Sequence, residues 1–97
     1  MIIKGNAIPF QNNRRPFDLE GREIKTKHFV TRITAPDNPF LPHKHEQSEL
    51  WFILEGNGVV TLEGKDFPVE KADLIILDPW QEHGLRTETE ITWICLG

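Results

Sequence analysis

Two histidines and a glutamate stand at spacings that suit a metal ion. His43 and His45 are two positions apart, and the two-residue period of a β-strand places both imidazoles on one face. Glu49 follows His45 by four positions, so a regular strand would bring its carboxylate to the same face. Taken alone, a His-x-His pair in a proline-rich loop is more often exposed to solvent than bound to metal. Together, the three side chains predict that one ion can be shared.

Short strands must position these residues. No segment longer than a few residues has the three-to-four spacing of apolar residues that a helix needs, and proline and glycine recur along the chain. Between them lie short runs of β-branched, aromatic and aliphatic residues, which favour strands. The expected strands are 24–34, 49–54, 58–62, 66–69, 74–77 and 91–96. This order predicts an all-β sandwich or barrel at 24–97, preceded by an irregular arm at 1–23 that must lie over something to be ordered.

The composition predicts one domain over residues 1–97. A chain of 97 residues is too short to divide its apolar residues between two cores. Its 38% hydrophobic and 27% charged residues are ordinary for a globular protein and argue against disorder. The net charge of -4, with lysines and arginines scattered among acids, argues against nucleic acid as a partner.

The single cysteine and the apolar runs bear on location. Cys95 has no second cysteine with which to form an intramolecular disulfide. The amino-terminal residues lack the apolar stretch of a signal peptide, and the longest apolar run, residues 50–54, is too short to cross a bilayer. We therefore expect a cytoplasmic protein that has no membrane partner.

Two segments resemble the sequence motifs of the cupin family. Residues 43–56 keep the order His-x-His-x-x-x-Glu-x-x-x-x-x-x-Gly of the first motif, and residues 72–83 are similar to the second, with His83 at its final histidine. Fifteen residues separate the segments, similar to the shortest spacing in this family. The resemblance spans about residues 28–96 and implies a double-stranded β-helix, which is the jelly-roll barrel of cupins.

Five positions depart from the family's pattern. Asp37 and Ala72 stand where the two motifs begin with glycine. In the second motif, Asp78 replaces the proline and Trp80 the glycine, and Thr87 replaces the closing asparagine. None of the five is a ligand. Glycine and proline shape turns, so these departures concern loop geometry rather than metal binding.

The resemblance implies that His43, His45, Glu49 and His83 hold one divalent metal ion. Three imidazoles and a carboxylate, without a thiolate, suit Fe, Mn, Ni, Cu or Zn better than Mg or Ca. Four protein ligands leave two positions of a six-coordinate ion for water, dioxygen or a chelating small molecule.

Two functions stay open, because cupins include dioxygenases, isomerases and plain binding proteins. The first is a metal-dependent enzyme of dioxygenase or isomerase type that acts on a small organic molecule, although no residue is identified as catalytic. The second is a non-catalytic module that binds a metal or a sugar-like ligand. Residues 49–83 are also similar to cupin domains of the mannose-6-phosphate isomerase type, although no cluster of lysine or arginine is evident for a phosphate.

Three residues are candidates for contacting a substrate. Trp51 shares the strand face of Glu49, and Trp80 and Gln81 precede His83 at the expected barrel mouth. Simple core packing explains Trp51 equally well.

Three further residues have open roles. His28 and Arg32 share one face of the first long strand, where they could act as a proton carrier and an anion clamp or be merely solvated. Cys95 is better explained as a small buried hydrophobe than as a nucleophile.

The strand at 49–54 is apolar on both faces. Its outward row, Leu50, Phe52 and Leu54, needs a cover, which the arm or a second subunit could supply. We expect a homodimer that uses this row, because a small barrel has few residues of its own to cover it.

Overall fold

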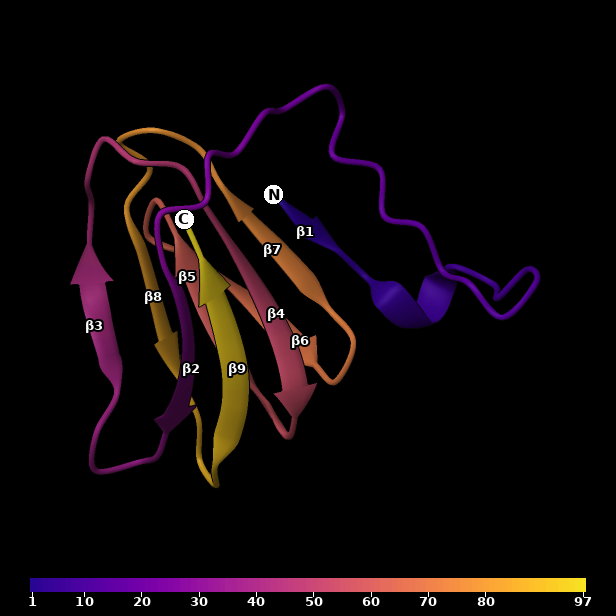
Figure 1. Ribbon diagram of the computed structural model, residues 1–97. Helices are drawn as coiled ribbons and strands as arrows, with labels where there is room; N and C mark the ends of the chain where they lie inside the picture. The colour runs from indigo at the N-terminus through magenta and orange to yellow at the C-terminus, as the bar shows by residue number, and fades with distance from the viewer.

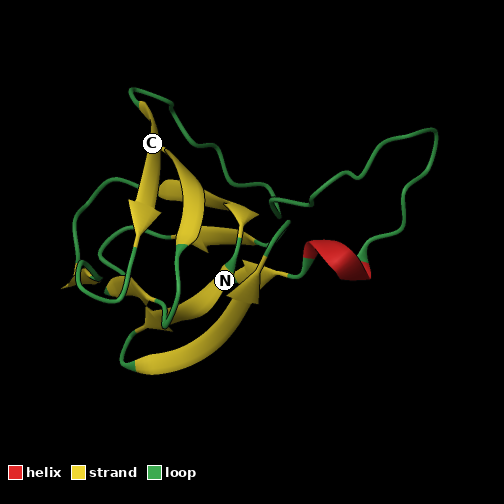
Figure 2. Ribbon diagram, turned by 90° about the horizontal axis from the view of Figure 1, so that it is seen from below, coloured by secondary structure: helices red, strands yellow, loops and turns green.

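The computed structural model describes residues 1–97 as two antiparallel β-sheets that face each other (Figures 1 and 2). The larger sheet has the strand order β1-β7-β4-β9-β2, and the smaller has the order β3-β8-β5-β6. The one helical element is the short 3-10 turn η1. The predicted all-β fold is therefore confirmed. The elements are β1 (Ile2–Ile3), η1 (Gly5–Ala7), β2 (Phe29–Thr34), β3 (Phe40–His43), β4 (Glu49–Glu55), β5 (Asn57–Leu62), β6 (Lys65–Glu70), β7 (Leu74–Leu77), β8 (His83–Arg86) and β9 (Ile91–Leu96).

The core lies between the inner faces of the two sheets. Along β4 and β9, every second side chain is buried, as expected when one face of a strand meets the core. Each large apolar side chain that is fully buried stabilises the fold by about 1.5–3 kcal/mol. No helix in the structure combines the length and the apolar character that a membrane span requires. The core consists of Trp51, Ile53, Val60, Leu62, Val69, Ile75, Leu77, Leu85, Ile91, Trp93 and Cys95.

Three strands were not predicted, namely β1, β3 and β8, and the last two carry histidines. The strand β3 contains Pro42 and is exposed at three of its four residues, so it lacks an apolar alternation. The strand β8 has four residues and includes Gly84, which weakens any strand signal. The expected start of β2 at residue 24 is wrong, since the strand begins at Phe29. The other predicted strands agree with the structure to within one residue at each end.

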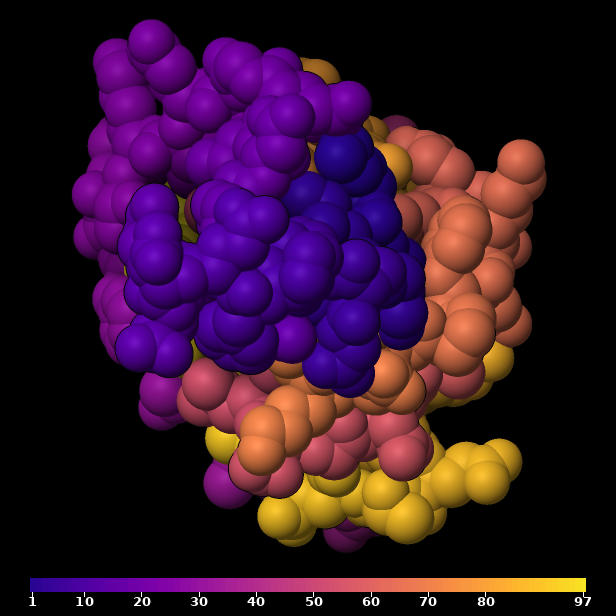
Figure 3. All heavy atoms as spheres, turned by 90° about the vertical axis from the view of Figure 1, so that its right-hand side faces the viewer, coloured from indigo at the N-terminus to yellow at the C-terminus, as the bar shows by residue number.

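The amino-terminal arm lies over the larger sheet, and its atoms spread across this side of the molecule in Figure 3. It is not wholly irregular, because β1 pairs with the edge strand β7. The ring of Phe17 packs edge-on against Phe52, with 5.9 Å between centroids. Asp73, which is completely buried, accepts a hydrogen bond from the Gly5 N–H at 3.2 Å and pairs with Lys4. These contacts hold the arm on the barrel.

Two departures from the cupin pattern fall where the backbone is left-handed. Ala72 has φ +76° and Trp80 has φ +62°, and at both positions the family's motif has glycine. A side chain in this conformation costs about 1 kcal/mol or more relative to glycine. The Trp80 N–H donates to the carbonyl of His45 at 2.8 Å, which ties the second turn to the histidine loop. The turns thus keep a glycine-like shape without glycine.

Candidate metal centre

Three histidines converge at one end of the barrel. His43 ends β3 and His83 begins β8, and the antiparallel pairing of these strands sets the two residues opposite each other. His45 lies in the loop that leads to β4. The ring centroids are separated by 4.5 Å for His43 and His83, 4.9 Å for His45 and His83, and 5.6 Å for His43 and His45. One nitrogen from each ring lies within 4.8 Å of the other two, so a single ion could contact all three.

His83 offers a nitrogen that nothing in the protein satisfies. The residue is only 1% exposed, and its Nδ1 lies 2.7 Å from the carbonyl oxygen of Gln81. Because a carbonyl can only accept, Nδ1 carries the hydrogen and Nε2 keeps its lone pair. This Nε2 is buried without a hydrogen-bond partner. Burial lowers the pKa of His83 despite the bond to Gln81, so the ring is neutral near pH 7.

The other two histidines are prepared in a similar way. The Nδ1 of His43 donates to the carbonyl of Leu41 at 2.9 Å, which leaves Nε2 free to act as a ligand. Metal-binding histidines commonly donate their second ring nitrogen to a carbonyl or carboxylate in this manner. His45 has a buried Nδ1 without a partner. The histidine cluster therefore contains two unsatisfied buried nitrogens, and the lone pair of His83 Nε2 is one that a bound cation would satisfy.

Glu49 lies beside the histidine cluster and faces two ways. Its Oε1 is 3.5 Å from Nε2 of His45 and accepts a hydrogen bond from Trp51 Nε1 at 3.2 Å. Its Oε2 is 3.5 Å from Nε2 of His28. The three histidines thus share one ligand-spaced group, whereas Glu49 contacts that group only through His45 and belongs by spacing to a second one.

That second group consists of His28, Glu49 and Cys95. Nε2 of His28 is 3.4 Å from Sγ of Cys95. Burial, together with the nearby Glu49 carboxylate, raises the pKa of the Cys95 thiol to about 12. Sequence reasoning left the roles of His28 and Cys95 open because their proximity depends on β9 lying between β2 and β4. Only the order of strands in the larger sheet shows that His28 and Cys95 lie close together.

The three candidates for substrate contact lie in different surroundings. Trp51 is fully buried, and its ring lies 5.3 Å from that of His83, so it packs against the site from the barrel core. The Gln81 side chain accepts the backbone N–H of Asp78 at 3.1 Å. Trp80 is 59% exposed and is the candidate whose ring is free to meet a ligand.

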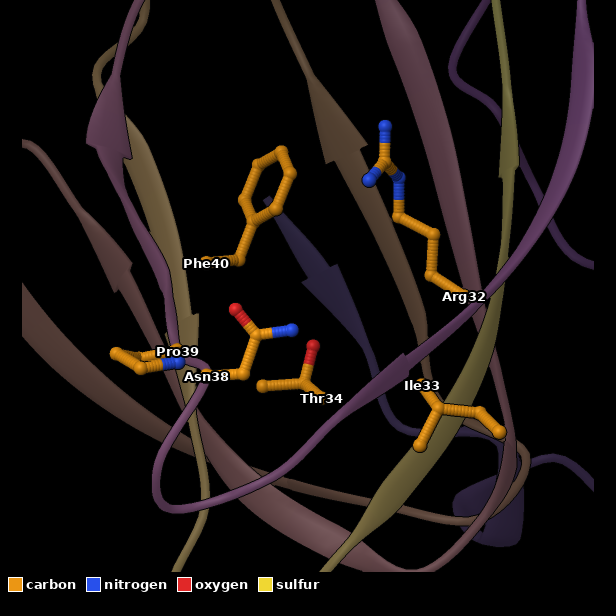
Figure 4. Close-up of a pocket in the computed structure, with 6 residues that line it drawn as sticks. All are labelled: Arg32, Ile33, Thr34, Asn38, Pro39 and Phe40. Carbon is orange, nitrogen blue, oxygen red and sulfur yellow. The ribbon is translucent and has the colours of Figure 1, made fainter.

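Arg32 projects into the seam between β2 and β3, which are edge strands of different sheets (Figure 4). Its Cζ is 5.1 Å from the ring centroid of Phe40 and 5.9 Å from that of Trp93. The Phe40 ring in turn lies 4.7 Å from the ring of His43. Arg32 forms no ion pair. The seam holds a hollow of about 270 Å³, lined by Arg32, Ile33, Thr34, Asn38, Pro39 and Phe40.

This fold and this cluster of histidines define a small β-barrel protein of the cupin type. The family model described as "Cupin domain" matches residues 32–97, which is more than half of the chain, so the chain belongs to the cupin family.

Several relatives are similar to the chain. An oxalate-binding protein of Thermotoga maritima is 31% identical over 68 residues, covering 69% of this chain and 56% of the relative. An uncharacterized protein of Methanocaldococcus jannaschii is 46% identical over 47 residues, covering 47% of this chain and 38% of the relative. The chain thus spans well under two thirds of these relatives' lengths.

Solved structures agree on the fold. A protein of Thermotoga maritima titled a "predicted oxalate decarboxylase" has a TM-score of 0.68 and 28% identity, covering 74% of this chain and 65% of that one. A cupin-2 domain protein of Shewanella frigidimarina has a TM-score of 0.66 and 14% identity, covering 78% of this chain and 74% of that one. The second likeness concerns the fold alone.

Proposed function

We propose that His43, His45, Glu49 and His83 hold one divalent transition metal ion, which is Fe, Mn, Ni, Cu or Zn. The observation that carries this proposal is the buried Nε2 of His83, which has no partner. An unsatisfied buried polar atom costs about 1–3 kcal/mol, and a bound ion would remove that cost. Imidazole nitrogens with one carboxylate are donors that suit these ions.

The ligand that we propose is a small organic acid. Names given to similar Thermotoga maritima sequences and structures support this class, namely an oxalate-binding protein and a predicted oxalate decarboxylase. Arg32 supports it independently, because a guanidinium without an acidic partner binds a carboxylate through two parallel hydrogen bonds. The Phe40 ring lies within 5.1 Å of the Arg32 Cζ and within 4.7 Å of the His43 ring. An acid held by Arg32 would therefore lie close to the histidine cluster.

The residues around the site would divide the work. A bound ion supplies Lewis-acid chemistry to the oxygen atoms of a chelating ligand. Arg32 would hold the ligand's negative charge, and the exposed ring of Trp80 would cover it at the mouth. Trp51 would orient the Glu49 carboxylate, and Gln81 would orient His83 through its backbone carbonyl. As an enzyme, the protein would convert this small molecule in a reaction of dioxygenase or isomerase type.

Binding without turnover is the second candidate function. The name of the Thermotoga maritima relative, an oxalate-binding protein, favours it because that name states binding alone. A sugar-like ligand belongs to the same class of function. An assay of oxygen uptake and of product formation, with oxalate and the iron-loaded protein, separates turnover from binding.

Calorimetric titration tests the metal and the ligand together. We expect the metal-loaded protein to bind oxalate and the metal-free protein not to bind it. His83→Gln should lose the metal. Arg32→Gln should keep the metal and weaken oxalate binding by at least about tenfold, which is 1.4 kcal/mol. Arg86→Gln, on the opposite sheet, is the matched control and should change neither. A His83→Gln variant that holds the ion as tightly as the wild type would refute the site.

The assembly and the location stay predictions. We propose a homodimer formed through the outer face of the larger sheet, because Phe29 and Ile33 on that face are 64% and 60% exposed although the arm covers Phe52. A monomer in light scattering at micromolar concentration would refute this. A cytoplasmic location rests on the single cysteine, and fractionation of cells tests it.

A further inference from the structure

We infer that His28, Glu49 and Cys95 form a second cation site, suited to a soft divalent ion such as Zn²⁺, beside the histidine cluster. The site shares Glu49 with the proposed metal centre but does not require that the centre be occupied. Imidazole, thiolate and carboxylate are all ligands of zinc, and the thiolate favours it over harder ions. The inference starts from how the Glu49 carboxylate is divided between its neighbours.

The two oxygens of Glu49 face different partners. Oε1 is 3.5 Å from His45 Nε2, within the histidine cluster, whereas Oε2 is 3.5 Å from His28 Nε2, outside it. Glu49 is 9% exposed, so this division occurs in a nearly water-free setting. A buried carboxylate with one oxygen toward each group is arranged to bridge two cations.

The distances within the second group match those around one tetrahedral ion. Nε2 of His28 is 3.4 Å from Sγ of Cys95 and 3.5 Å from Oε2 of Glu49. Zinc bonds of about 2.0–2.3 Å at tetrahedral angles separate neighbouring ligand atoms by about 3.3–3.6 Å. The ligand atoms of the three residues all lie within 4.8 Å of one another. The two separations from His28 therefore already match ligand spacing.

Hydrogen bonding is the alternative account of this arrangement, with the His28 Nε2–H and the Cys95 thiol as the two donors toward Glu49. An ion in the middle satisfies all three atoms at once. Binding displaces the hydrogen of the thiol as a proton to water, and the thiolate then donates its electron pair to the ion.

The backbone holds this group in place. The His28 N–H donates to the carbonyl of Gly97 at 2.7 Å, and the Gly97 N–H donates back at 3.2 Å. A Cβ at position 97 would stand 2.8 Å from Cγ of Glu49 and 3.3 Å from Cε1 of His28, so only glycine allows this close packing. Cys95 is buried, while the side chain of His28 is 43% exposed. Solvent can therefore reach the fourth position of an ion.

Titration of the metal-free protein with Co²⁺ tests the second site directly. We expect two equivalents to bind, with a near-ultraviolet thiolate-to-cobalt charge-transfer band that reports Cys95. Cys95→Ser should abolish the band and lower the stoichiometry from two to one. His28→Gln should do the same while leaving the thiol in place. Retention of the band in His28→Gln would show that His28 is not a ligand of the second site.

The same titration separates this inference from the proposed metal centre. His83→Gln should bind one equivalent fewer than the wild type and keep the thiolate band. A thiolate band in this variant would show that the second site binds an ion even when the histidine site is lost. One equivalent in the wild type, without a thiolate band, overturns the inference. In that case Cys95→Ser would at most weaken the one site by about 10–100-fold, as a supporting neighbour does. The wild-type spectrum decides even if a variant fails to fold.

Discussion

The two sheets bury their inner faces alike but differ on their outer faces. The smaller sheet carries a polar group outside, in which Arg86 pairs with Asp66 at 2.8 Å and both contact Thr61. The larger sheet carries an apolar row on β4 and the exposed rings and chains of β2. A sheet with a wet outer face alternates polar and apolar residues, whereas a sheet covered on both sides does not. The larger sheet is therefore built to be covered, first by the arm.

A carboxylate introduced on each outer face gives the largest expected contrast. Phe52→Asp places a carboxylate under Phe17 and should cost about 3–4 kcal/mol or unfold the protein. Val59→Asp makes the matched change on the outer face of the smaller sheet and should cost about 1 kcal/mol or less. Urea unfolding of both variants measures the difference. Equal costs would contradict the contrast between the sheets.

Loss of Asp73, which anchors the arm, should have the next largest effect on stability. Asp73 accepts the N–H groups of Gly5 and Glu70, at 3.2 and 2.8 Å, and pairs with Lys4. Asp73→Ala leaves these donors without a partner and should cost about 2 kcal/mol. Trypsin should then cleave the freed arm after Arg14 far faster than in the wild type. Unchanged cleavage would mean that contacts other than Asp73 hold the arm.

Acid should loosen the arm through a second, weaker link. The guanidinium of Arg22 donates to the Asp78 carboxylate at 2.8 Å and holds the pKa of Asp78 below its ordinary 3.8. The unfolded chain therefore binds this proton more readily than the folded one, so the contribution is complete above pH 3.8 and is lost as the pH falls through the folded pKa. The ring resonances of Phe17 should shift in that range. Arg22→Gln is the control, and its resonances should already be shifted at neutral pH.

The polar outer face of the smaller sheet should give the smallest effect. Arg86→Ala removes an exposed ion pair with Asp66, and exposed pairs contribute little because solvent screens them. We expect no measurable change in the midpoint of urea unfolding. A clear loss of stability would mean that this face, too, depends on its contacts.

The strands with dense apolar runs could be predicted, and those without such runs could not. The residues of β4, β7 and β9 are apolar enough to identify each strand. By contrast, β3 and β8 join through a register shift between Phe40 and His43, and little in their own residues indicates pairing. Their position depends on the whole barrel.

The functional site, like the strands, could be predicted only in part. The spacing of His43, His45 and Glu49 indicated a shared face, and the resemblance to cupins added His83. The second role of Glu49 could not be predicted, because residues 28 and 95 meet only through the order of strands in the larger sheet. Local sequence determines the periodicity of a strand, while its neighbours are determined by long-range pairing.

The position of β9 governs when the protein can fold. This strand is the last along the chain, yet it lies between β4 and β2 in the larger sheet. Until it has left the ribosome, β2 has no partner and β4 has an open edge. Such distant pairings slow folding, because a long loop must close before they form. The larger sheet can therefore be completed only after residues 91–96 have left the ribosome, and a nascent chain halted before residue 91 should stay unfolded and prone to aggregate.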